Sequence, residues 1–125
     1  MKKTMKIGIM PKDEFIAMTM AIAKGEYKPK PDDPKIWFES LQSMSQVLSN
    51  ENRELLSIIA DNKPQSLKDL EVLSGRKSSN LSRTLKTMQR YGFIDLVKKR
   101  REIVPVVNVT NLKLEFDLFH RHKFA

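Results

Sequence analysis

The 125-residue sequence contains no cysteine, and this absence removes several kinds of chemistry. Without thiols the chain has no disulfide framework, no Cys-based zinc site and no thiol nucleophile. Histidine, another common metal ligand, occurs only at His120 and His122 near the C-terminus. Because two histidines supply only half of the ligands that zinc usually takes, we expect no metal and no other cofactor.

Long apolar runs are missing as well. The basic start MKKTMKIGIM is interrupted from Pro11 by PKDE, which leaves no apolar region of a signal peptide. No stretch approaches the roughly 18 uninterrupted apolar residues of a membrane helix. A glycine-rich phosphate loop and a paired-carboxylate spacing are also absent from the sequence. We therefore expect a soluble, cytoplasmic protein that has no membrane contact and is not an enzyme.

Acidic residues are scarce in one stretch, RKSSNLSRTLKTMQRYGFIDLVKKRR at residues 76–101. This stretch holds nine of the 23 basic residues and one of the 15 acidic ones, so the other 99 residues carry 14 of each. The whole net charge of +8 therefore comes from residues 76–101. A concentrated positive surface attracts polyanions, and nucleic acid is the commonest polyanion in the cytosol. Charge kept only for solubility would be interspersed with acids, as it is elsewhere in this chain.

The start of the chain is expected to be an appendage joined by a linker. Residues 1–27 should form a strand at Thr4–Met10 and a helix from Pro11 to about Lys24. The helix is apolar on much of its circumference, so we expect it to pack against the main domain, a second copy or a partner. The run KPKPDDPK at residues 28–35 has three prolines and is typical of an extended linker.

Residues 36–118 should form one domain that begins with three helices. The first should span residues 36–48, the second should be capped by Ser49 or Asn50, and the short third should be capped by Ser66. Their inward side chains recur at spacings of three and four. These side chains are Trp37, Leu41, Met44 and Leu48 in the first helix, Leu55, Leu56 and Ile59 in the second, and Leu67, Leu70 and Leu73 in the third.

A fourth helix, capped by Ser78 or Ser79, should end before Gly92. One face of this helix is apolar and the opposite face is a stripe of three cations and a hydroxyl, because the residues of each face recur at helical spacing. The apolar face comprises Leu81, Leu85 and Met88, and the polar stripe comprises Ser79, Arg83, Lys86 and Arg90.

The remaining segments predict a hairpin and a last strand. Two β segments at residues 93–97 and 103–107 flank a basic tip, and Pro105 suits an edge because it cannot donate to a ladder. Residues 112–118 alternate strictly between apolar and polar, which predicts a half-buried strand, and residues 119–125 should form a tail. The four cations of the hairpin tip are Lys98, Lys99, Arg100 and Arg101.

These elements follow one another in the order of a winged helix-turn-helix. We therefore predict an α+β fold: a winged helix-turn-helix made of a helical core, a β-hairpin wing and a C-terminal strand, with an N-terminal strand-helix extension. The short third helix would brace the fourth at a steep angle, so that the polar face of the fourth can enter a major groove. The same trihelical unit also occurs as a scaffold for protein contacts, which is the alternative interpretation.

The polar stripe supplies the candidate DNA contacts. Arg83 should contact bases, because its planar guanidinium can span guanine O6 and N7. Further candidates for base contacts are Ser79, Asn80 and Ser82, although Ser79 and Asn80 are equally suited to capping the helix. The candidates for phosphate contacts, which fix the register without specifying sequence, are Arg76, Lys77, Lys86 and Arg90. The wing cations Lys98, Lys99, Arg100 and Arg101 should follow the DNA backbone or enter a minor groove.

Residues 36–118 resemble predicted DNA-binding regulators of archaea and bacteria that have a MarR-like winged helix. The resemblance rests on FESL at Phe38, ELL at Glu54, the P-x-S-L-x-D-L pattern from Pro64, GR at Gly75, YGFI at Tyr91 and the VP of the wing. It implies a regulator that represses its own promoter. Similar bacterial proteins resemble antitoxins, which implies a second role in neutralising a partner protein. Many relatives have a short acidic wing, whereas this chain has KKRR.

We expect a sequence-specific regulator that binds double-stranded DNA as a homodimeric repressor on a palindromic operator, because one helix covers few base pairs. Residues 1–27 are the expected dimer or partner surface. One alternative is an antitoxin that binds a cognate toxin and autoregulates its operon. Another is an RNA-binding winged helix, against which the scarcity of aromatic residues argues.

Overall fold

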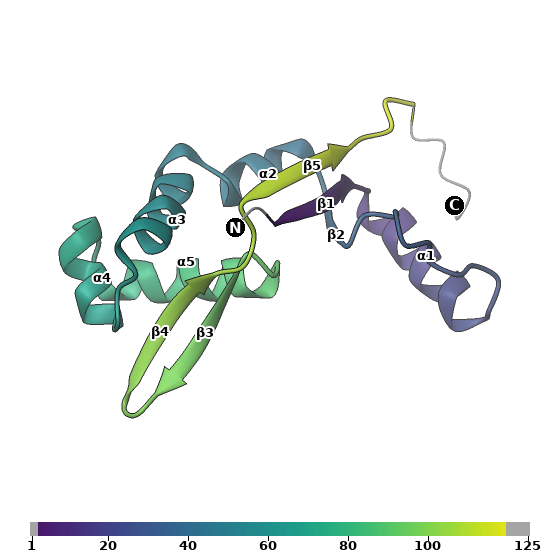
Figure 1. The fold of residues 1–125 in the computed structure, drawn as a ribbon. Helices are drawn as coiled ribbons and strands as arrows, with labels where there is room; N and C mark the ends of the chain where they lie inside the picture. The colour runs from purple at the N-terminus through teal and green to yellow at the C-terminus, as the bar shows by residue number, and fades with distance from the viewer. Residues whose placement is uncertain (1–2, 120–125) are drawn as a thin grey trace. The chain divides into compact units, whose positions relative to one another are not determined.

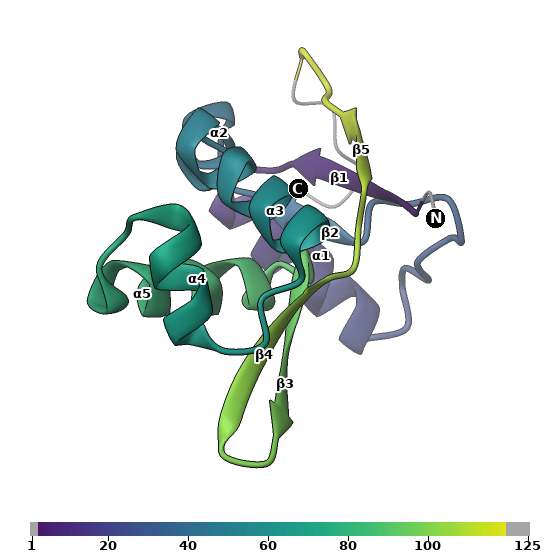
Figure 2. The ribbon, with the colours of Figure 1, turned by 60° about the vertical axis from the view of Figure 1, so that its left-hand side comes forward.

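The computed structural model describes residues 3–119 and has a mixed α+β architecture (Figure 1 and Figure 2). The helices are α1 (Lys12–Ala23), α2 (Leu41–Val47), α3 (Asn50–Asn62), α4 (Leu67–Ser74) and α5 (Ser78–Arg90). The strands are β1 (Thr4–Ile9), β2 (Ile36–Phe38), β3 (Ile94–Lys99), β4 (Glu102–Val107) and β5 (Asn111–Glu115). The predicted α+β class is therefore confirmed. Within the described residues, no helix has both the length and the apolar character that crossing a membrane requires.

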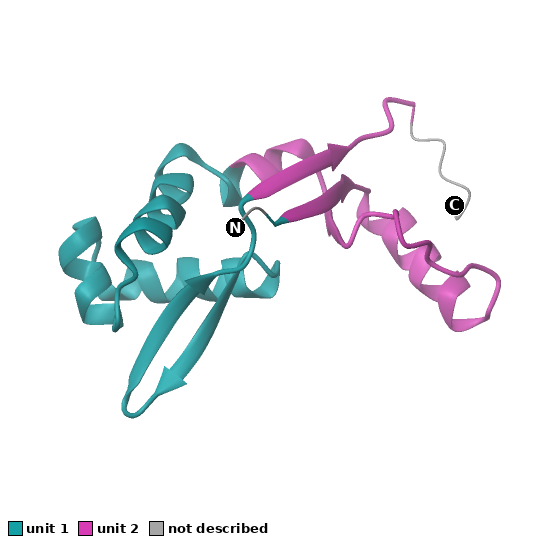
Figure 3. Cartoon of the chain, in the orientation of Figure 1, with its two compact units in different colours: residues 1–3, 46–110 teal, residues 4–45, 111–125 magenta. Residues whose placement is uncertain are grey.

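The chain divides into two compact units, which Figure 3 distinguishes by colour. Unit 1 contains residues 1–3 and 46–110, and unit 2 contains residues 4–45 and 111–125. These boundaries differ from the predicted ones, which separated an extension at residues 1–27 from a domain at residues 36–118. The reason is strand pairing: β1 lies between β2 and β5 in one sheet, so the first and last strands belong to the same unit.

Unit 2 is built on this parallel sheet, whose strand order is β2-β1-β5. Residues 36–38 lie in register with residues 7–9, and Phe38 is completely buried there. The helix predicted over residues 36–48 is therefore wrong in its first part, which forms β2 instead, while α2 starts later. The position of Trp37 matched a helical spacing, but this side chain packs across the sheet.

Glycine at position 8 is required by the tryptophan beside it. Gly8 pairs with Trp37 in β2 and with Glu115 in β5, so the three residues share one face of the sheet. A Cβ atom on Gly8 would lie 2.6 Å from Trp37 Cε3 and 3.1 Å from Pro34 Cγ. Real Cβ atoms essentially never come within 3.0 Å of another group, so only glycine lets the indole lie against this strand.

Residues 28–35 are attached to the sheet, although the three prolines predicted an extended linker. The backbone N–H of Lys35 donates to the carbonyl of Lys6 at 3.0 Å. The side chain of Pro34 is buried and lies beside Gly8. Because both contacts lie inside unit 2, the segment is part of that unit and does not separate two domains.

A turn within this segment is held by one carboxylate. Asp33 Oδ2 accepts a hydrogen bond from the backbone N–H of Lys30 at 2.8 Å and another from the Tyr27 hydroxyl. The hydrogen bond to Asp33, together with burial, raises the pKa of Tyr27 to about 12. The Lys30 N–H and the Tyr27 hydroxyl in turn lower the pKa of Asp33. Both shifts favour the ionised carboxylate bonded to the neutral phenol.

The last strand differs from the half-buried strand predicted over residues 112–118. β5 ends at Glu115 and is exposed at every position, including Leu112 and Leu114. It is one of the two edge strands, so only one of its sides is paired, with β1, and its apolar face lies at the rim of the sheet. Of the predicted tail at residues 119–125, only Phe119 lies within the described residues.

The predicted caps of α3 and α4 in unit 1 are confirmed. Ser49 Oγ accepts from the N–H of Asn52 at 3.2 Å at the start of α3. Ser66 Oγ accepts from the N–H of Asp69 at 3.0 Å, while Asp69 Oδ2 accepts from the N–H of Gln65 at 3.1 Å. Asp69 thus takes the position of the Glu of a capping box, but its carboxylate accepts from the residue before the cap and not from the N–H of Ser66.

Two details of the predicted helices are wrong. The residue before α5 is Lys77, and no side chain caps this helix, so Ser78 is its first residue and neither serine is the cap. Leu73 in α4 is exposed, whereas Leu70 is completely buried. α4 has only eight residues, so only a narrow face of it meets its neighbours.

The core of unit 1 joins the three helices to the hairpin. The apolar face predicted for α5 is confirmed, because Leu81, Leu85 and Met88 are all buried. The hairpin of β3 and β4 is confirmed as well, and Figure 1 and Figure 2 both show its tip projecting beyond the helices of unit 1. The other buried members of this core are Leu55, Ile59, Leu70, Phe93, Ile94 and Val104.

Gly8→Ala should lower the free energy of unfolding by about 2 kcal/mol, because the new methyl group overpacks the site beside Trp37. Urea unfolding followed by circular dichroism measures this loss. The same substitution in a Trp37→Ala background should cost much less, since the clashing ring is gone. Equal losses in both backgrounds would show that the contact with the indole is not the cause.

Tyr27 should ionise near pH 12 in the folded protein, as measured by its absorbance near 295 nm. A Tyr91→Phe background leaves Tyr27 as the single tyrosine. Because folding raises this pKa above its ordinary 10.0, the stabilisation is complete below pH 10 and is lost as the pH rises toward 12. Asp33→Asn should move the titration toward the ordinary value. If the pKa of Tyr27 is the same in Asp33→Asn, the hydrogen bond to Asp33 is not the cause of the shift. The fluorescence of Trp37 verifies that the fold persists.

Candidate nucleic-acid interface

The exposed face of α5 is polar. The helix is strongly amphipathic because its apolar residues recur at spacings of three and four, which turns the residues between them toward solvent. Arg83, Lys86 and Arg90 are exposed along this face, as are Ser79 and Asn80 near its start. The polar stripe predicted from the sequence therefore lies on the surface.

An open groove in unit 1, about 710 Å³ in volume, brings five of the predicted residues together. The predicted residues that line it are Arg76, Lys77, Ser79, Asn80 and Arg83. Its other lining residues are Glu51, Asn52 and Thr84. Lys86, Arg90 and the half-buried Ser82 lie outside this groove, as do the four hairpin cations.

Two helix starts meet at this groove. Glu51 and Asn52 belong to the first turn of α3, and Ser79 and Asn80 belong to the first turn of α5. The first N–H groups of a helix have no partner inside the helix, and they favour anions. Because no side chain caps α5, its N–H groups are directed to solvent or to a ligand. The polar stripe of α5 could be found in the sequence, but the residues that α3 contributes to the groove could not, because they depend on how the helices pack.

Arg76 is tied into the protein at the edge of the groove. Its Nη1 donates to Asn52 Oδ1 at 3.1 Å and to Asn80 Oδ1 at 3.4 Å, and the side chain is half-buried. These two bonds connect α3 to the start of α5. The first function of Arg76 is therefore to hold the two helix starts together, and only its remaining N–H donors are directed elsewhere.

Arg83 differs from Arg76 in having no such tie. Its side chain is exposed, and within the described residues it has no hydrogen-bond or ion-pair partner. The whole planar fork of donors is thus available to a ligand in the groove. Arg90, further along the stripe, donates weakly at 3.4 Å to Thr87 Oγ1.

The hairpin tip gathers four cations in a row. Lys99 pairs with Glu102 at the last position of the ladder, and Arg100 and Arg101 form the turn between them. Arg100 adopts a left-handed backbone with φ of 56°. Residues 98–101 are all exposed, so their charges act on whatever approaches the tip.

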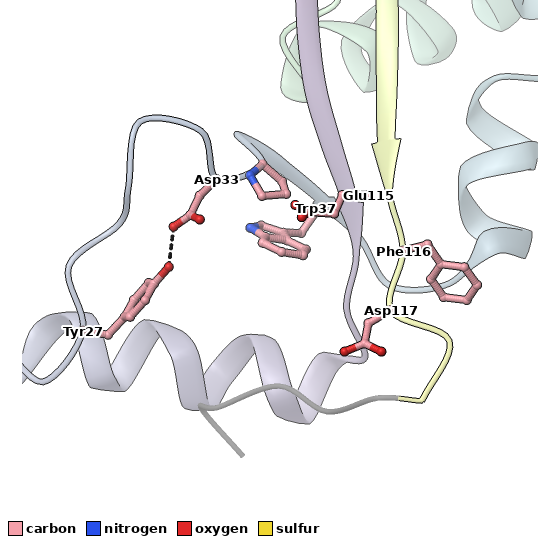
Figure 4. A pocket seen from close by; sticks show the side chains of 7 residues that line it. Tyr27, Asp33, Trp37, Glu115, Phe116 and Asp117 are labelled. Carbon is pink, nitrogen blue, oxygen red and sulfur yellow. Dashed lines mark hydrogen bonds between the residues drawn. The ribbon is translucent and has the colours of Figure 1, made fainter.

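Unit 2 contains a second pocket, of about 380 Å³, that the sequence did not predict (Figure 4). Tyr27 and Trp37 contribute aromatic rings, and Asp33, Glu115 and Asp117 contribute carboxylates. Aromatic rings and carboxylates together favour cations over anions. This pocket is thus opposite in chemical character to the groove of unit 1.

The described residues contain no metal site. In residues 3–119 there is no group of three or more His, Cys, Asp or Glu side chains that could hold a metal ion. His120 and His122 lie outside the described residues.

Comparison with known proteins assigns a family. The HVO_A0114 family model matches residues 47–114. That range covers α3 to α5, the hairpin and most of β5, and it contains every predicted DNA contact. A search of curated proteins and a search of solved structures each found no match. The match spans more than half of the chain, which therefore belongs to the HVO_A0114 family.

Proposed function

We propose that this chain is a sequence-specific transcriptional regulator that binds double-stranded DNA through a MarR-like winged helix-turn-helix. In this proposal α4 and α5 are the helix-turn-helix, α5 is the recognition helix, and the β3–β4 hairpin is the wing. The observation that supports it most is the exposed groove at the start of α5, where cations and hydroxyls accompany an uncapped helix start. We propose a dimeric repressor on a palindromic operator because one recognition helix covers only a few base pairs of DNA.

Base contacts are assigned to the exposed residues of the first two turns of α5. The major groove is about 12 Å wide and admits an α-helix. Arg83 has an unoccupied fork that suits guanine O6 and N7, and Ser79 and Asn80 lie one turn before it on the same helix. The carbonyl of Asn80 faces Arg76, so its amide N–H groups remain as donors. Ser82 is half-buried, which gives it a smaller part.

Phosphate contacts are assigned to the helix start and to the other cations. Lys77 precedes the uncapped N–H groups of α5, so a phosphate there would meet both the charge and the helix dipole. Arg76 would contribute through the donors that its internal bonds leave. Lys86, Arg90 and the hairpin cations 98–101 would lie along the backbone or reach a minor groove, adding affinity without sequence preference.

A second candidate function is an antitoxin that binds a toxin protein and also regulates its operon. The observation that favours it is the exposed apolar surface of α1, on which Phe15, Ile16 and Met20 are each more than two fifths exposed. Exposed apolar patches of this kind mark protein contacts. Copurification of a neighbouring gene product at equal stoichiometry would support this candidate. RNA binding is less favoured, because the groove lining contains no aromatic side chain on which bases could stack.

The protein should prefer DNA from upstream of its own operon over a scrambled duplex by roughly 10³, and should keep that advantage as salt rises. Fluorescence anisotropy at low and near-physiological salt measures both affinities. If both duplexes bind alike and both are lost with salt, the positive surface is only an electrostatic one and the regulator proposal fails.

Arg83→Ala should reduce the preference for the native duplex by about 1 to 3 kcal/mol and leave binding to the scrambled duplex nearly unchanged. Lys98→Ala combined with Arg100→Ala should instead weaken both duplexes and lower the salt slope by about 1 for each lost phosphate contact. Lys86→Ala, on the same face of α5, is the matched control for charge. Equal losses on both duplexes for Arg83→Ala would remove this residue from base contact.

A further inference from the structure

We infer that β5 is a self-pairing edge, through which two copies of the chain join antiparallel and merge their sheets. This inference deepens the proposed function, since it names the surface of the dimer proposed there. It also replaces part of the dimer surface predicted from the sequence, namely the strand of residues 1–27. β1, the strand of residues 1–27, already has β2 on one side and β5 on the other, so neither of its edges is open.

The apolar face of the sheet continues to the outer edge of β5 and is uncovered there. In-register residues of neighbouring parallel strands share a face, so Ile36, Ile7 and Leu114 form one apolar row. Ile7, in the middle of this row, is 1% exposed, whereas Leu114 is 46% exposed. Leu112, two residues earlier on the same face, is 36% exposed. The row is thus buried in its middle, half-buried at Ile36 and exposed at Leu114.

β5 lacks two of the features that keep edge strands apart, a bulge and a proline. Its register with β1 runs without a bulge from Asn111 to Glu115, and it contains no proline. The other edge of this sheet, β2, has only three residues and ends in the buried Phe38. In unit 1, by contrast, β4 contains Pro105, which has no N–H to donate, and is flanked by the cations of the hairpin tip. Within the described residues, no strand lies on the outer side of β5.

The sequence of β5 is complementary to itself in one antiparallel register. With the two-fold axis at Leu114, Lys113 lies opposite the partner's Glu115, and the same pair recurs by symmetry. On the other face Leu114 meets the partner's Leu114, and Leu112 meets the partner's Phe116. Phe116 is the residue after β5 and also lines the pocket of unit 2 (Figure 4). An axis at Lys113 would instead oppose two lysines, which is unfavourable.

This complementarity identifies the occupant as a second copy of the chain. A strand from another protein would need only a matching apolar face, and nothing would require Lys113 and Glu115 to be two residues apart around a leucine. Antiparallel pairing of identical strands is favoured by that arrangement, because each strand presents the same pattern in reverse and both charge pairs are then matched.

Charge reversal at Lys113 tests the register in the full chain without DNA. Lys113→Glu would place two pairs of carboxylates opposite each other and should weaken dimerisation roughly ten- to thirty-fold in sedimentation equilibrium, less so at high salt. Lys113→Glu combined with Glu115→Lys restores both pairs and should restore the dimer. A monomeric wild type at micromolar concentration, an unchanged dimer in Lys113→Glu, or a stronger one would overturn the proposal.

A cross-link tests the two-fold axis directly. The chain has no cysteine, so Leu114→Cys introduces a single thiol that would lie opposite its own copy. Opposed residues of antiparallel strands have Cα atoms about 4.5 to 5.5 Å apart, which suits a disulfide. Mild oxidation should link Leu114→Cys into a covalent dimer. The control, Leu112→Cys, has similar exposure but lies two residues from the axis and should stay unlinked. Equal linking of both variants, or of neither, would overturn the axis.

These outcomes separate the two proposals. If the charge-reversal pair and the cross-link behave as expected but no DNA is preferred, the self-pairing edge stands and the regulator fails. If the native duplex is preferred while Lys113→Glu leaves dimerisation unchanged, the regulator stands and β5 is not its dimer contact. Association through the exposed face of α1 would then be the remaining route.

Discussion

The parallel pairing of β1 with β5 is the contact on which the organisation of this chain depends. It joins the first strand to the last and places β1 in the middle of its sheet. The chain therefore leaves unit 2 after residue 45 and returns to it at residue 111, so that residues 46–110 of unit 1 are an insertion in sequence between two strands of one sheet. Just before β5, Thr110 exchanges hydrogen bonds with Lys3: its N–H donates to the Lys3 carbonyl at 2.9 Å and its hydroxyl accepts from the Lys3 N–H at 2.8 Å.

Local signals in the sequence predicted unit 1 well because its elements are specified locally. α3 and α4 have serine caps and α5 has a strong apolar period, so their positions followed from the chain itself. The hairpin followed from two β-rich runs around a polar tip. Unit 2 was predicted poorly for the opposite reason. A three-residue strand such as β2 has too little length to show a period, and parallel pairing between distant segments leaves no local mark. Trp37 matched a helical spacing by coincidence, while the decisive feature was Gly8, twenty-nine residues earlier, which leaves room for its ring.

In the candidate interface, too, the features that depend on composition could be predicted and those that depend on packing could not. The sequence identified the positive stretch and the exposed face of α5, but it could not distinguish Arg76 from Arg83. Both are arginines of one basic stretch, and their difference comes from acceptors on another helix. Asn52 holds Arg76 in place, whereas the Arg83 side chain makes no hydrogen bond or ion pair within the described residues. A tied guanidinium positions the helix start, and an untied one remains available for a ligand.

The open edge of unit 2 has a physical origin in the type of its sheet. Parallel sheets are normally buried, because the crossover connections between their strands place helices on both faces. A sheet of three strands has little area with which to bury its own edges. β5 combines an apolar face, which gains by being covered, with Lys113 and Glu115, which keep the other face compatible with water. Pairing with an identical strand would cover the apolar face and match these two charges at the same time. The exposed edge of unit 2 therefore carries a sequence that could pair with an identical strand.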